Sequence, residues 1–515
     1  MTILRESLQY EPVELAFGTS GLRGLVTDMT DLECYINTQG FIRFLENFEG
    51  LGKNSTIAVA GDLRDSTPRI QGAVIRAITD SGHKAQYCGL IPTPALALWA
   101  QNANQAAVMV TGSHIPADRN GIKFYKPSGE VLKSDESNIK QSVADVRSEL
   151  YELKADDNLF SSDGMLVAYE LPEIEPRAEQ NFTDRYKNMF DSKFLSGKQV
   201  IVYQHSSVGR DLLVDILQYL GAETIPVDRS EKFITIDTEN VTQENQDYFR
   251  SLAQKYPDAF AIISADGDSD RPFVVDEKGG FHRGDVLGFI VSREIGVDFA
   301  AIPISSSDAV DESLEKENIS WKHTKIGSPY VIEEMTKSGA KLPVGWEVNG
   351  GFLVGADFDY EGKKVERLPT RDSFLPIFIA LEAATKRSIK VSGLFSELPA
   401  RFTQAGLIDN FPNQTSHNII SKFSKGSTGK LLAEKIFNDQ YGFDKLKNID
   451  TTDGARLYFN SGDIVHVRPS GNAPQLRVYS VANSQARADE IVSISLGEDG
   501  LLRQLEKAVT KIVVS

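Results

Sequence analysis

An apolar run, Ala106–Val110, leads into the sequence Thr111-Gly-Ser-His-Ile-Pro-Ala-Asp-Arg-Asn-Gly-Ile-Lys-Phe-Tyr125. The run is typical of a buried strand bounded by turn residues. The loop after it carries a hydroxyl, an imidazole and an ammonium on Ser113, His114 and Lys123. These groups follow the carboxyl end of the predicted strand, where open α/β sheets bind their ligands. A plain hairpin is the competing interpretation, because Thr-Gly-Ser and Asn-Gly are also ordinary turn sequences.

Predicted strands and helices alternate around this loop. Thr56–Ala60 and His83–Cys88 have strand patterns, and the amphipathic stretch Arg69–Ser81 between them predicts a helix. The same order recurs from Gln199 to Val227 and again from Phe299 to Gly351. Such alternation implies right-handed crossovers and parallel pairing. The predicted fold class is α/β, with three similar α/β domains that have mixed, mainly parallel sheets, plus a smaller C-terminal α+β domain, around one central cleft.

The chain of 515 residues is too long for a single hydrophobic core, and its length suggests about three or four domains. An acidic stretch that contains prolines, Glu149–Asn181, indicates a linker. We predict four domains, each with one polar loop that follows a strand. Their predicted bounds are 1–165, 166–285, 286–398 and 399–515.

Composition limits the classes of partner. The formal net charge is −17, and the sequence shows no clustered basic face of the kind that binds nucleic acids or anionic membranes. Cys34 and Cys88 lack metal-ligand spacing, which favours buried thiols in a reducing compartment. Met1–Glu14 has no apolar signal core, and no window approaches the roughly 18 apolar residues of a membrane span. We therefore expect a cytoplasmic protein without nucleic-acid or membrane partners.

Two further loops are suited to ions. The glycine-rich turn Phe17–Gly24 presents Arg23 together with backbone amides, a combination that can bind an anion. Asp266-Gly-Asp-Ser-Asp-Arg271 places three carboxylates at alternate positions, so that all three can face one hard cation such as Mg²⁺. A calcium-binding EF-hand is disfavoured, because the required glutamate and the flanking helices are missing. A solvent-exposed acidic turn that binds no metal stays open as the alternative interpretation.

A fourth loop lies near the C-terminus and reads Arg468-Pro-Ser-Gly-Asn-Ala-Pro-Gln-Leu-Arg477. It follows a predicted strand and combines guanidinium, hydroxyl, amide and backbone N–H groups. Those are the parts of a phosphate-binding nest. As a bare string it would also fit an ordinary turn.

Together these loops resemble the motifs of the α-D-phosphohexomutases of the phosphomannomutase and phosphoglucomutase type. The family patterns are Gly-Thr-x-Gly-hydrophobic-Arg-Gly, Thr-Gly/Ala-Ser-His-Asn-Pro, Asp-Gly-Asp-x-Asp-Arg and Arg-Pro-Ser-Gly-Thr-Glu-Pro. They occur here in the family's order, with Ile115 in place of the asparagine and Asn472-Ala473 in place of Thr-Glu. A fifth segment, which corresponds to the sugar-binding loop of the family and is called the sugar loop below, differs more from the family pattern. Gly345-Trp-Glu-Val-Asn-Gly-Gly351 stands where the family commonly shows Gly-Glu-x-Ser-Gly-His.

The resemblance implies an enzyme that interconverts hexose 6-phosphate and hexose 1-phosphate through a phosphoserine. It also implies Mg²⁺ as cofactor and hexose 1,6-bisphosphate as intermediate and activator. The implied catalytic residues are Ser113, as the phosphoserine, and His114, Lys123, Arg23 and Arg271; Lys123 and His114 are alternatives for the general acid or base. The implied metal ligands are Ser113, through its phosphate, and Asp266, Asp268 and Asp270.

Substrate contacts are implied on two loops. The sugar loop would supply Glu347 and Asn349, and Glu347 can accept hydrogen bonds from two sugar hydroxyls. The non-reacting phosphate would be bound by Arg468, Ser470, Gly471, Asn472 and Arg477. The expected partner is a small sugar phosphate, and the sequence leaves the oligomeric state open.

Alternatives stay open at three levels. Within the family the N-terminal and C-terminal loops favour mannose and glucose phosphates, but the Glu-x-Asn-Gly portion of the sugar loop also resembles acetylglucosamine-phosphate mutases, and glucosamine phosphate remains an alternative. A non-catalytic sugar-phosphate binding protein would need neither the serine nor the aspartates. A phosphatase with the same metal loop would release free phosphate.

Overall fold

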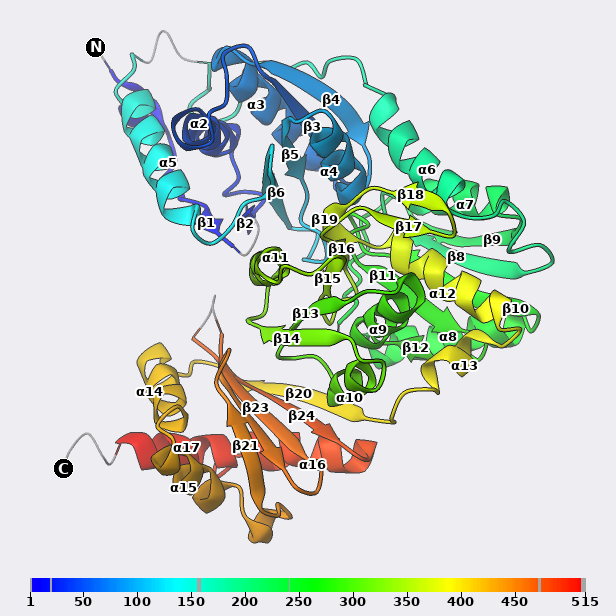
Figure 1. Ribbon diagram of the computed structural model, residues 1–515. Coiled ribbons are helices and arrows are strands. Elements are labelled where there is room, and N and C mark those ends of the chain that lie inside the picture. The colour runs from blue at the N-terminus through cyan, green and yellow to red at the C-terminus, as the bar shows by residue number, and fades with distance from the viewer. Residues whose placement is uncertain (1, 19–20, 155–158, 240, 471–473, 511–515) are drawn as a thin grey trace. The chain divides into compact units, whose positions relative to one another are not determined.

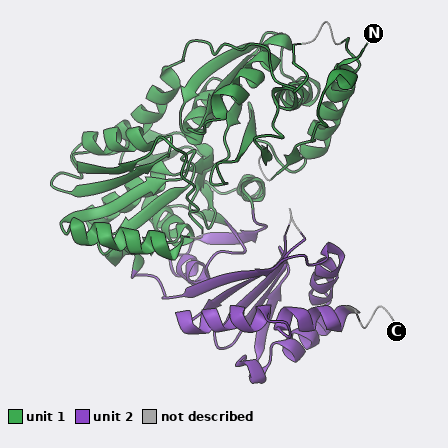
Figure 2. Ribbon diagram, turned by 180° about the vertical axis from the view of Figure 1, so that it is seen from behind, with its two compact units in different colours: residues 1–301, 327–395 green, residues 302–326, 396–515 purple. Residues whose placement is uncertain are grey.

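The computed structural model describes residues 2–18, 21–154, 159–239, 241–470 and 474–510 (Figure 1). The chain divides into two compact units (Figure 2). Unit 1 contains residues 1–301 and 327–395, and unit 2 contains residues 302–326 and 396–515. Within the described ranges, no helix is both long enough and apolar enough to cross a membrane.

The first α/β region of unit 1 is built on a sheet with the order β1-β2-β6-β5-β3-β4, with β7 beside β6. Strand β3 pairs in parallel with β4 and β5, whereas β5 and β6 are antiparallel. All five residues of β5 are buried, as expected of a central strand covered on both faces. The strands are β1 (Ala16–Phe17), β2 (Gly21–Leu25), β3 (Thr56–Gly61), β4 (Lys84–Leu90), β5 (Ala106–Val110), β6 (Arg119–Lys126) and β7 (Gly129–Glu130). The helices are α1 (Leu4–Ser7), α2 (Asp31–Phe48), α3 (Thr67–Asp80), α4 (Thr93–Asn102) and α5 (Glu136–Tyr151).

The second region repeats this plan with a sheet in the order β12-β11-β10-β8-β9. Strand β8 pairs in parallel with β9 and β10, and β11 turns back antiparallel to β10. The strands are β8 (Gln199–His205), β9 (Glu223–Arg229), β10 (Ala259–Ala265), β11 (Pro272–Asp276) and β12 (Phe281–His282). The helices are α6 (Arg177–Met189), α7 (Arg210–Tyr219) and α8 (Gln243–Lys255).

The third region again joins parallel and antiparallel pairs. Strand β13 pairs in parallel with β15 through Phe299, Ala300 and Ala301, and β16 is antiparallel to both β15 and β19. The strands are β13 (Phe299–Pro303), β15 (Pro343–Trp346), β16 (Phe352–Val354) and β19 (Leu368–Asp372), with a hairpin of β17 (Phe358–Tyr360) and β18 (Lys363–Val365). The helices are α9 (Gly284–Ile295), α11 (Ser328–Lys337), α12 (Phe374–Lys386) and α13 (Val391–Phe395).

Unit 2 contains an antiparallel sheet in the order β20-β24-β23-β22-β21, and the α-helices between residues 413 and 510 pack with this sheet around one apolar core. The strands of this sheet are β20 (Phe402–Ile408), β21 (Leu446–Asp450), β22 (Ala455–Phe459), β23 (Ile464–Pro469) and β24 (Leu476–Ala482), whereas β14 (Ser320–Thr324) is not part of it. The helices are α10 (Asp308–Lys316), α14 (Asn413–Phe423), α15 (Ser427–Ile436), the 3₁₀-helix η2 (Asp439–Tyr441), α16 (Gln485–Leu496) and α17 (Leu501–Thr510).

The predicted fold class, three similar α/β domains and an α+β C-terminal module, is confirmed. In each α/β region the parallel pairing is confined to one half of the sheet, because the strand after the central one returns through a tight loop rather than a helix. The predicted linker overlaps two helices, since α5 continues to Tyr151 and α6 begins at Arg177. The four domain boundaries stay predictions.

Candidate functional site

Ser113 lies in the loop between β5 and β6, so the hairpin interpretation and the functional interpretation describe the same segment. Its hydroxyl is buried and donates a hydrogen bond of 2.6 Å to Asp266 Oδ2. Its φ is +53°, a left-handed conformation that is uncommon outside glycine and clusters at functional sites. The preceding Gly112 has no room for a side chain, because a Cβ there would lie 2.5 Å from Arg64 Cζ.

Asp62 and Arg64 hold the serine loop from the end of β3. Asp62 accepts hydrogen bonds from the Thr111 hydroxyl, at 2.8 Å, and from the Gly112 N–H, at 3.3 Å. The buried Arg64 guanidinium donates to the carbonyl oxygens of three loop residues, Ser113, Ile115 and Pro116, and to that of Arg119 at the start of β6. These contacts fix the backbone from which the serine hydroxyl projects. Sequence reasoning missed both residues.

Asp266, Asp268 and Asp270 converge directly after β10. One oxygen from each carboxylate lies within 4.8 Å of the others, and all three residues are buried. Asp266 Oδ1 accepts the N–H groups of Asp270 and Arg271 at 3.1 and 3.2 Å, which closes the loop on itself. The alternate spacing predicted from the sequence therefore does bring the three carboxylates to one point, and Ser113 lies at the same point.

The oxygen atoms of this cluster fit a divalent cation. Asp268 Oδ1 and Asp270 Oδ1 are buried and have no hydrogen-bond partner among the described residues. Asp266 contributes Oδ2, which faces the serine hydroxyl. Burial, followed by repulsion from Asp268 and Asp270, raises the pKa of Asp266 well above its usual value. Carboxylate and hydroxyl oxygens are the ligands of hard cations such as Mg²⁺.

Lys123 places its ammonium among these carboxylates. Its Nζ lies 2.6 Å from both Asp268 Oδ2 and Asp270 Oδ2. Burial opposes the charged form, but the two carboxylates outweigh it and raise the pKa of Lys123, so the ammonium stays protonated.

Two predicted arginines lie at the same site. Arg271 Nε lies 3.6 Å from Asp270 Oδ1 and 3.9 Å from Asp266 Oδ2. Arg23, on β2, remains exposed to solvent, yet desolvation by the surrounding protein and repulsion from Arg271 and Arg371 lower its pKa to about 10. It still carries its charge near neutral pH. The site therefore concentrates positive charge beside the carboxylates.

His114 is the neutral member of the site. Its Nδ1 lies 3.3 Å from the Ser113 hydroxyl. Burial, together with the positive charges of Arg271 and Arg23, lowers the pKa of His114 to about 2. The neutral imidazole can accept a hydrogen bond, whereas the Lys123 ammonium can only donate.

Glu347 and Asn349 lie in the tight turn between β15 and β16. Glu347 Oε2 accepts a hydrogen bond of 3.0 Å from Arg371 Nη1. Asn349 Nδ2 donates to Glu239 Oε1 at 3.1 Å, and its Oδ1 accepts the Gly351 N–H at 3.0 Å. The amide of Asn349 thus already has protein partners that shape the turn, and its contact with a sugar stays a prediction.

Sequence reasoning also missed Arg371 and Thr93. Arg371 Nε and Nη2 donate to Asp270 Oδ2 at 3.0 and 2.9 Å, while the Thr93 hydroxyl donates to Asp268 Oδ2 at 2.6 Å. Neither residue belongs to a recognisable motif. The Pro-Thr-Pro sequence at residues 92–94 was the signal available for Thr93.

Arg468 and Arg477 lie opposite each other on β23 and β24 of unit 2. Like charges directly across a strand pair are destabilising, which favours an anion as a third partner. Arg468 Nε lies 3.1 Å from Asp453 Oδ2, and Arg477 Nη2 donates to Gln475 Oε1 at 3.4 Å. The Ser470 N–H donates to the Gln475 carbonyl oxygen at 2.9 Å. The predicted contacts Gly471 and Asn472 lie outside the described residues.

Family models match four consecutive parts of the chain. They describe phosphoglucomutase/phosphomannomutase alpha/beta/alpha domains I, II and III at residues 14–149, 180–280 and 284–402, and the C-terminal domain at residues 422–494. A phosphomannomutase of Salmonella muenchen is 38% identical over 484 residues, with 93% of this chain and 94% of the relative covered. A phosphomannomutase of Sinorhizobium fredii is 36% identical, with 93% and 98% covered. A phosphoglucosamine mutase of Thermosipho africanus is 26% identical, with 90% and 93% covered.

Solved structures support the fold. A phosphoglucomutase/phosphomannomutase family protein of Burkholderia thailandensis superposes with a TM-score of 0.71 at 19% identity, covering 97% of this chain and 98% of that one. The N-acetylphosphoglucosamine mutase of Aspergillus fumigatus, solved with GlcNAc-6P and magnesium, superposes with a TM-score of 0.52 at 13% identity, covering 99% and 98%.

Proposed function

We propose that this chain, which belongs to the phosphoglucomutase/phosphomannomutase family, interconverts mannose 6-phosphate and mannose 1-phosphate. The observation that carries the proposal is the 2.6 Å contact between the Ser113 hydroxyl and the buried aspartate cluster, because it sets a nucleophile beside a cation site. Two phosphomannomutases are 38% and 36% identical to the chain, against 26% for a phosphoglucosamine mutase, which favours mannose over the amino sugars. Glucose phosphates are the second expected substrate.

The proposed reaction consists of two opposite transfers. The free O1 or O6 hydroxyl of the bound sugar attacks phosphorus on phospho-Ser113; the new P–O bond forms as the bond to the serine oxygen breaks, and the hydroxyl gives up its proton. The product is a hexose 1,6-bisphosphate. After it turns over in the site, the Ser113 oxygen attacks its other phosphate, and a proton returns to the departing sugar oxygen. No phosphate is lost to water.

The chain's own groups serve this transfer by position and charge. Asp266, Asp268 and Asp270, with an oxygen on Ser113, would hold Mg²⁺, which when bound neutralises charge on the phosphoryl group. Arg271 and Arg23 supply fixed positive charge, which stabilises the negative charge on the equatorial oxygens of the transferring phosphoryl group. Lys123 and His114 stay the alternatives for the proton transfers: the Lys123 ammonium can donate a proton, and His114 Nδ1 lies 3.3 Å from the serine oxygen.

Substrate contacts complete the proposal. Glu347 would accept hydrogen bonds from the sugar hydroxyls, with Asn349 as a further contact. The loop that contains Arg468, Ser470, Gly471, Asn472 and Arg477 would bind the phosphate that does not react. A clamp that recognises only phosphate can serve both orientations of the bisphosphate. Cys34 and Cys88 are buried free thiols, which supports a reducing, cytoplasmic location.

Arg468→Ala is expected to raise KM for mannose 1-phosphate by about 10- to 100-fold and to change kcat by less than about threefold. A charge-assisted hydrogen bond contributes roughly 1.5–3 kcal/mol, and this contact is made equally in the ground state and the transition state. Steady-state kinetics measures both constants. Lys430→Ala, on α15, is the control and should leave both unchanged. A fall in kcat with an unaltered KM would contradict the assigned role.

The sugar preference is tested by measuring turnover of mannose 1-phosphate, glucose 1-phosphate, glucosamine 1-phosphate and N-acetylglucosamine 1-phosphate side by side. We expect kcat/KM for mannose 1-phosphate to exceed that of either amino sugar by about tenfold or more, since a site that hydrogen-bonds sugar hydroxyls discriminates against altered ones. A preference for an amino sugar would overturn the choice of substrate. Release of free phosphate at rates comparable to isomerisation would instead indicate a phosphatase.

A further inference from the structure

Arg371, at the end of β19, joins the aspartate loop to the sugar loop. Its Nε and Nη2 donate to Asp270 Oδ2 at 3.0 and 2.9 Å, and its Nη1 donates to Glu347 Oε2 at 3.0 Å. All three groups are buried. A planar guanidinium can bind two carboxylates in fixed directions at once, which a single ammonium cannot do.

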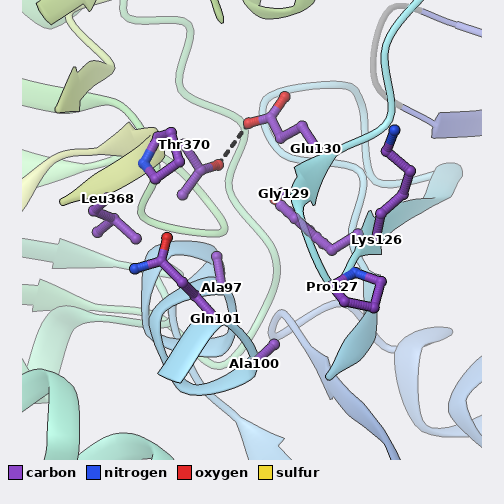
Figure 3. Close-up of a pocket in the computed structure, with 11 residues that line it drawn as sticks. Ala97, Ala100, Gln101, Lys126, Pro127, Gly129, Glu130, Leu368 and Thr370 are labelled. Atoms are coloured by element: carbon purple, nitrogen blue, oxygen red, sulfur yellow. Dashed lines mark hydrogen bonds between the residues drawn. The ribbon is translucent and has the colours of Figure 1, made fainter. Parts of the chain in front are cut away.

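The residues on either side of Arg371 are anchored separately. Thr370 donates from its hydroxyl to Glu130 Oε1 on β7 at 2.5 Å (Figure 3). Asp372 accepts hydrogen bonds from the Tyr186 hydroxyl of α6 and from the Phe374 N–H. Because side chains alternate along a strand, these two anchors share one face of β19 and Arg371 projects from the other. The strand therefore holds the guanidinium in a fixed place.

Gly351 leaves the space that the Arg371 side chain occupies. A Cβ on Gly351 would lie 2.5 Å from Arg371 Cδ, 2.6 Å from its Cγ and 2.8 Å from its Cβ. Real Cβ contacts are essentially never shorter than 3.0 Å, and these atoms belong to the inner part of the side chain, which cannot swing away as its tip could. Gly351 is also the residue that stands in place of the histidine expected from the family pattern. A side chain here and the observed position of Arg371 exclude each other.

We propose that Gly351 and Arg371 act as a pair that positions Glu347 for the sugar: the glycine makes room, and the arginine orients the Glu347 carboxylate relative to the metal loop. The inference rests on the proposed function, in which Glu347 accepts hydrogen bonds from the sugar hydroxyls. Arg371 is a positioning residue for sugar selectivity, because it acts on the substrate through Glu347.

The test compares Gly351→Ala, Arg371→Ala and the double variant with the parent protein. With mannose 1-phosphate, Gly351→Ala should lower kcat/KM by about 100-fold, the cost of displacing a positioned group by roughly 1 Å. In the Arg371→Ala background the same methyl group should change kcat/KM by less than about threefold, because its collision partner is gone. Such non-additivity is the mark of direct contact. Gly52→Ala is the control glycine, since its nearest neighbour would be 3.8 Å away.

Two further readouts separate positioning from a general loss of structure. The ratio of kcat/KM for mannose 1-phosphate to that for glucose 1-phosphate should fall toward one in Arg371→Ala. Arg371→Lys should not restore this ratio, because lysine keeps the positive charge but lacks the planar guanidinium that binds two carboxylates at once. Gly351→Ala should lower the unfolding midpoint by about 2–4 °C relative to the parent protein, and the same substitution should lower it by much less when it is made in the Arg371→Ala background. That measurement needs no substrate, so it tests the contact even if the protein proves inactive on hexose phosphates.

Equal effects of Gly351→Ala in both backgrounds, on turnover and on the unfolding midpoint, would show that the two residues do not act as a pair. An unchanged sugar ratio in Arg371→Ala, or full restoration by Arg371→Lys, would overturn the positioning role.

Discussion

Ser113→Ala is expected to abolish the phosphoenzyme and to lower mannose 1-phosphate turnover by about 10⁵-fold or more. The substitution removes the oxygen that carries the phosphoryl group between the two positions of the sugar, and loss of a covalent nucleophile has an effect of about this size in other enzymes. Intact-protein mass spectrometry after incubation with a hexose 1,6-bisphosphate should show a species about 80 Da heavier in the parent protein and none in the variant.

The fold should tolerate this change. Alanine removes one hydrogen bond to Asp266 and adds no volume, so the unfolding midpoint should move by only a few degrees. Ser142→Ala, at a buried serine in α5, provides a control that should keep both the heavier species and full turnover. A heavier species that persisted in Ser113→Ala would place the phosphoryl group on another residue and would refute the proposed mechanism.

Asp268→Asn is expected to lower turnover by about 10³-fold and to weaken its dependence on Mg²⁺. The substitution keeps the shape of the side chain but removes one of three charges from the cluster, and charge stabilisation of a transferring phosphoryl group is worth several kcal/mol. Lys123 keeps Asp270 as a partner at 2.6 Å, so the ammonium does not become an unpaired buried charge. Little loss of stability should follow.

Two measurements check this outcome: calorimetric titration of the protein with Mn²⁺ or Mg²⁺, and turnover as a function of Mg²⁺ concentration. Asp276→Asn is a suitable comparison, because Asp276 is also buried but its carboxylate binds the backbone N–H groups of Lys278 and Gly280 rather than the cluster. It should bind the cation normally. Full activity of Asp268→Asn would show that the three aspartates do not form the metal site.

The local parts of the site could be predicted because their chemistry is contiguous in the sequence. Three aspartates at alternate positions of one tight loop lie close together in space, and a serine that follows a buried strand lies at the edge of a sheet. That these two loops meet, although they are 153 residues apart, followed only from the family resemblance. Alternation of strands and helices likewise predicted the α/β regions but not the antiparallel strands that close each sheet.

Arg371, Arg64 and Thr93 could not be predicted, because their roles depend on partners far along the chain. Arg371 lies 101 residues from Asp270, and Thr93 lies 175 residues from Asp268. Apart from the Pro-Thr-Pro sequence around Thr93, nothing in their immediate sequences distinguishes them from other polar residues. Asn349 shows the converse, since the family resemblance implied a sugar contact, which stays a prediction, while the fold engages its amide with Glu239 and Gly351.

The bridge that Lys123 makes between Asp268 and Asp270 should let the protein fold without a bound metal ion. Because an internal ammonium already satisfies one oxygen of each acid, the loop can assume its shape on a newly made chain before any ion arrives. A chelator should therefore abolish the activity without unfolding the protein. Adding the metal ion back should restore the activity. Proteins that fold only when their metal is bound would instead unfold when the metal is removed.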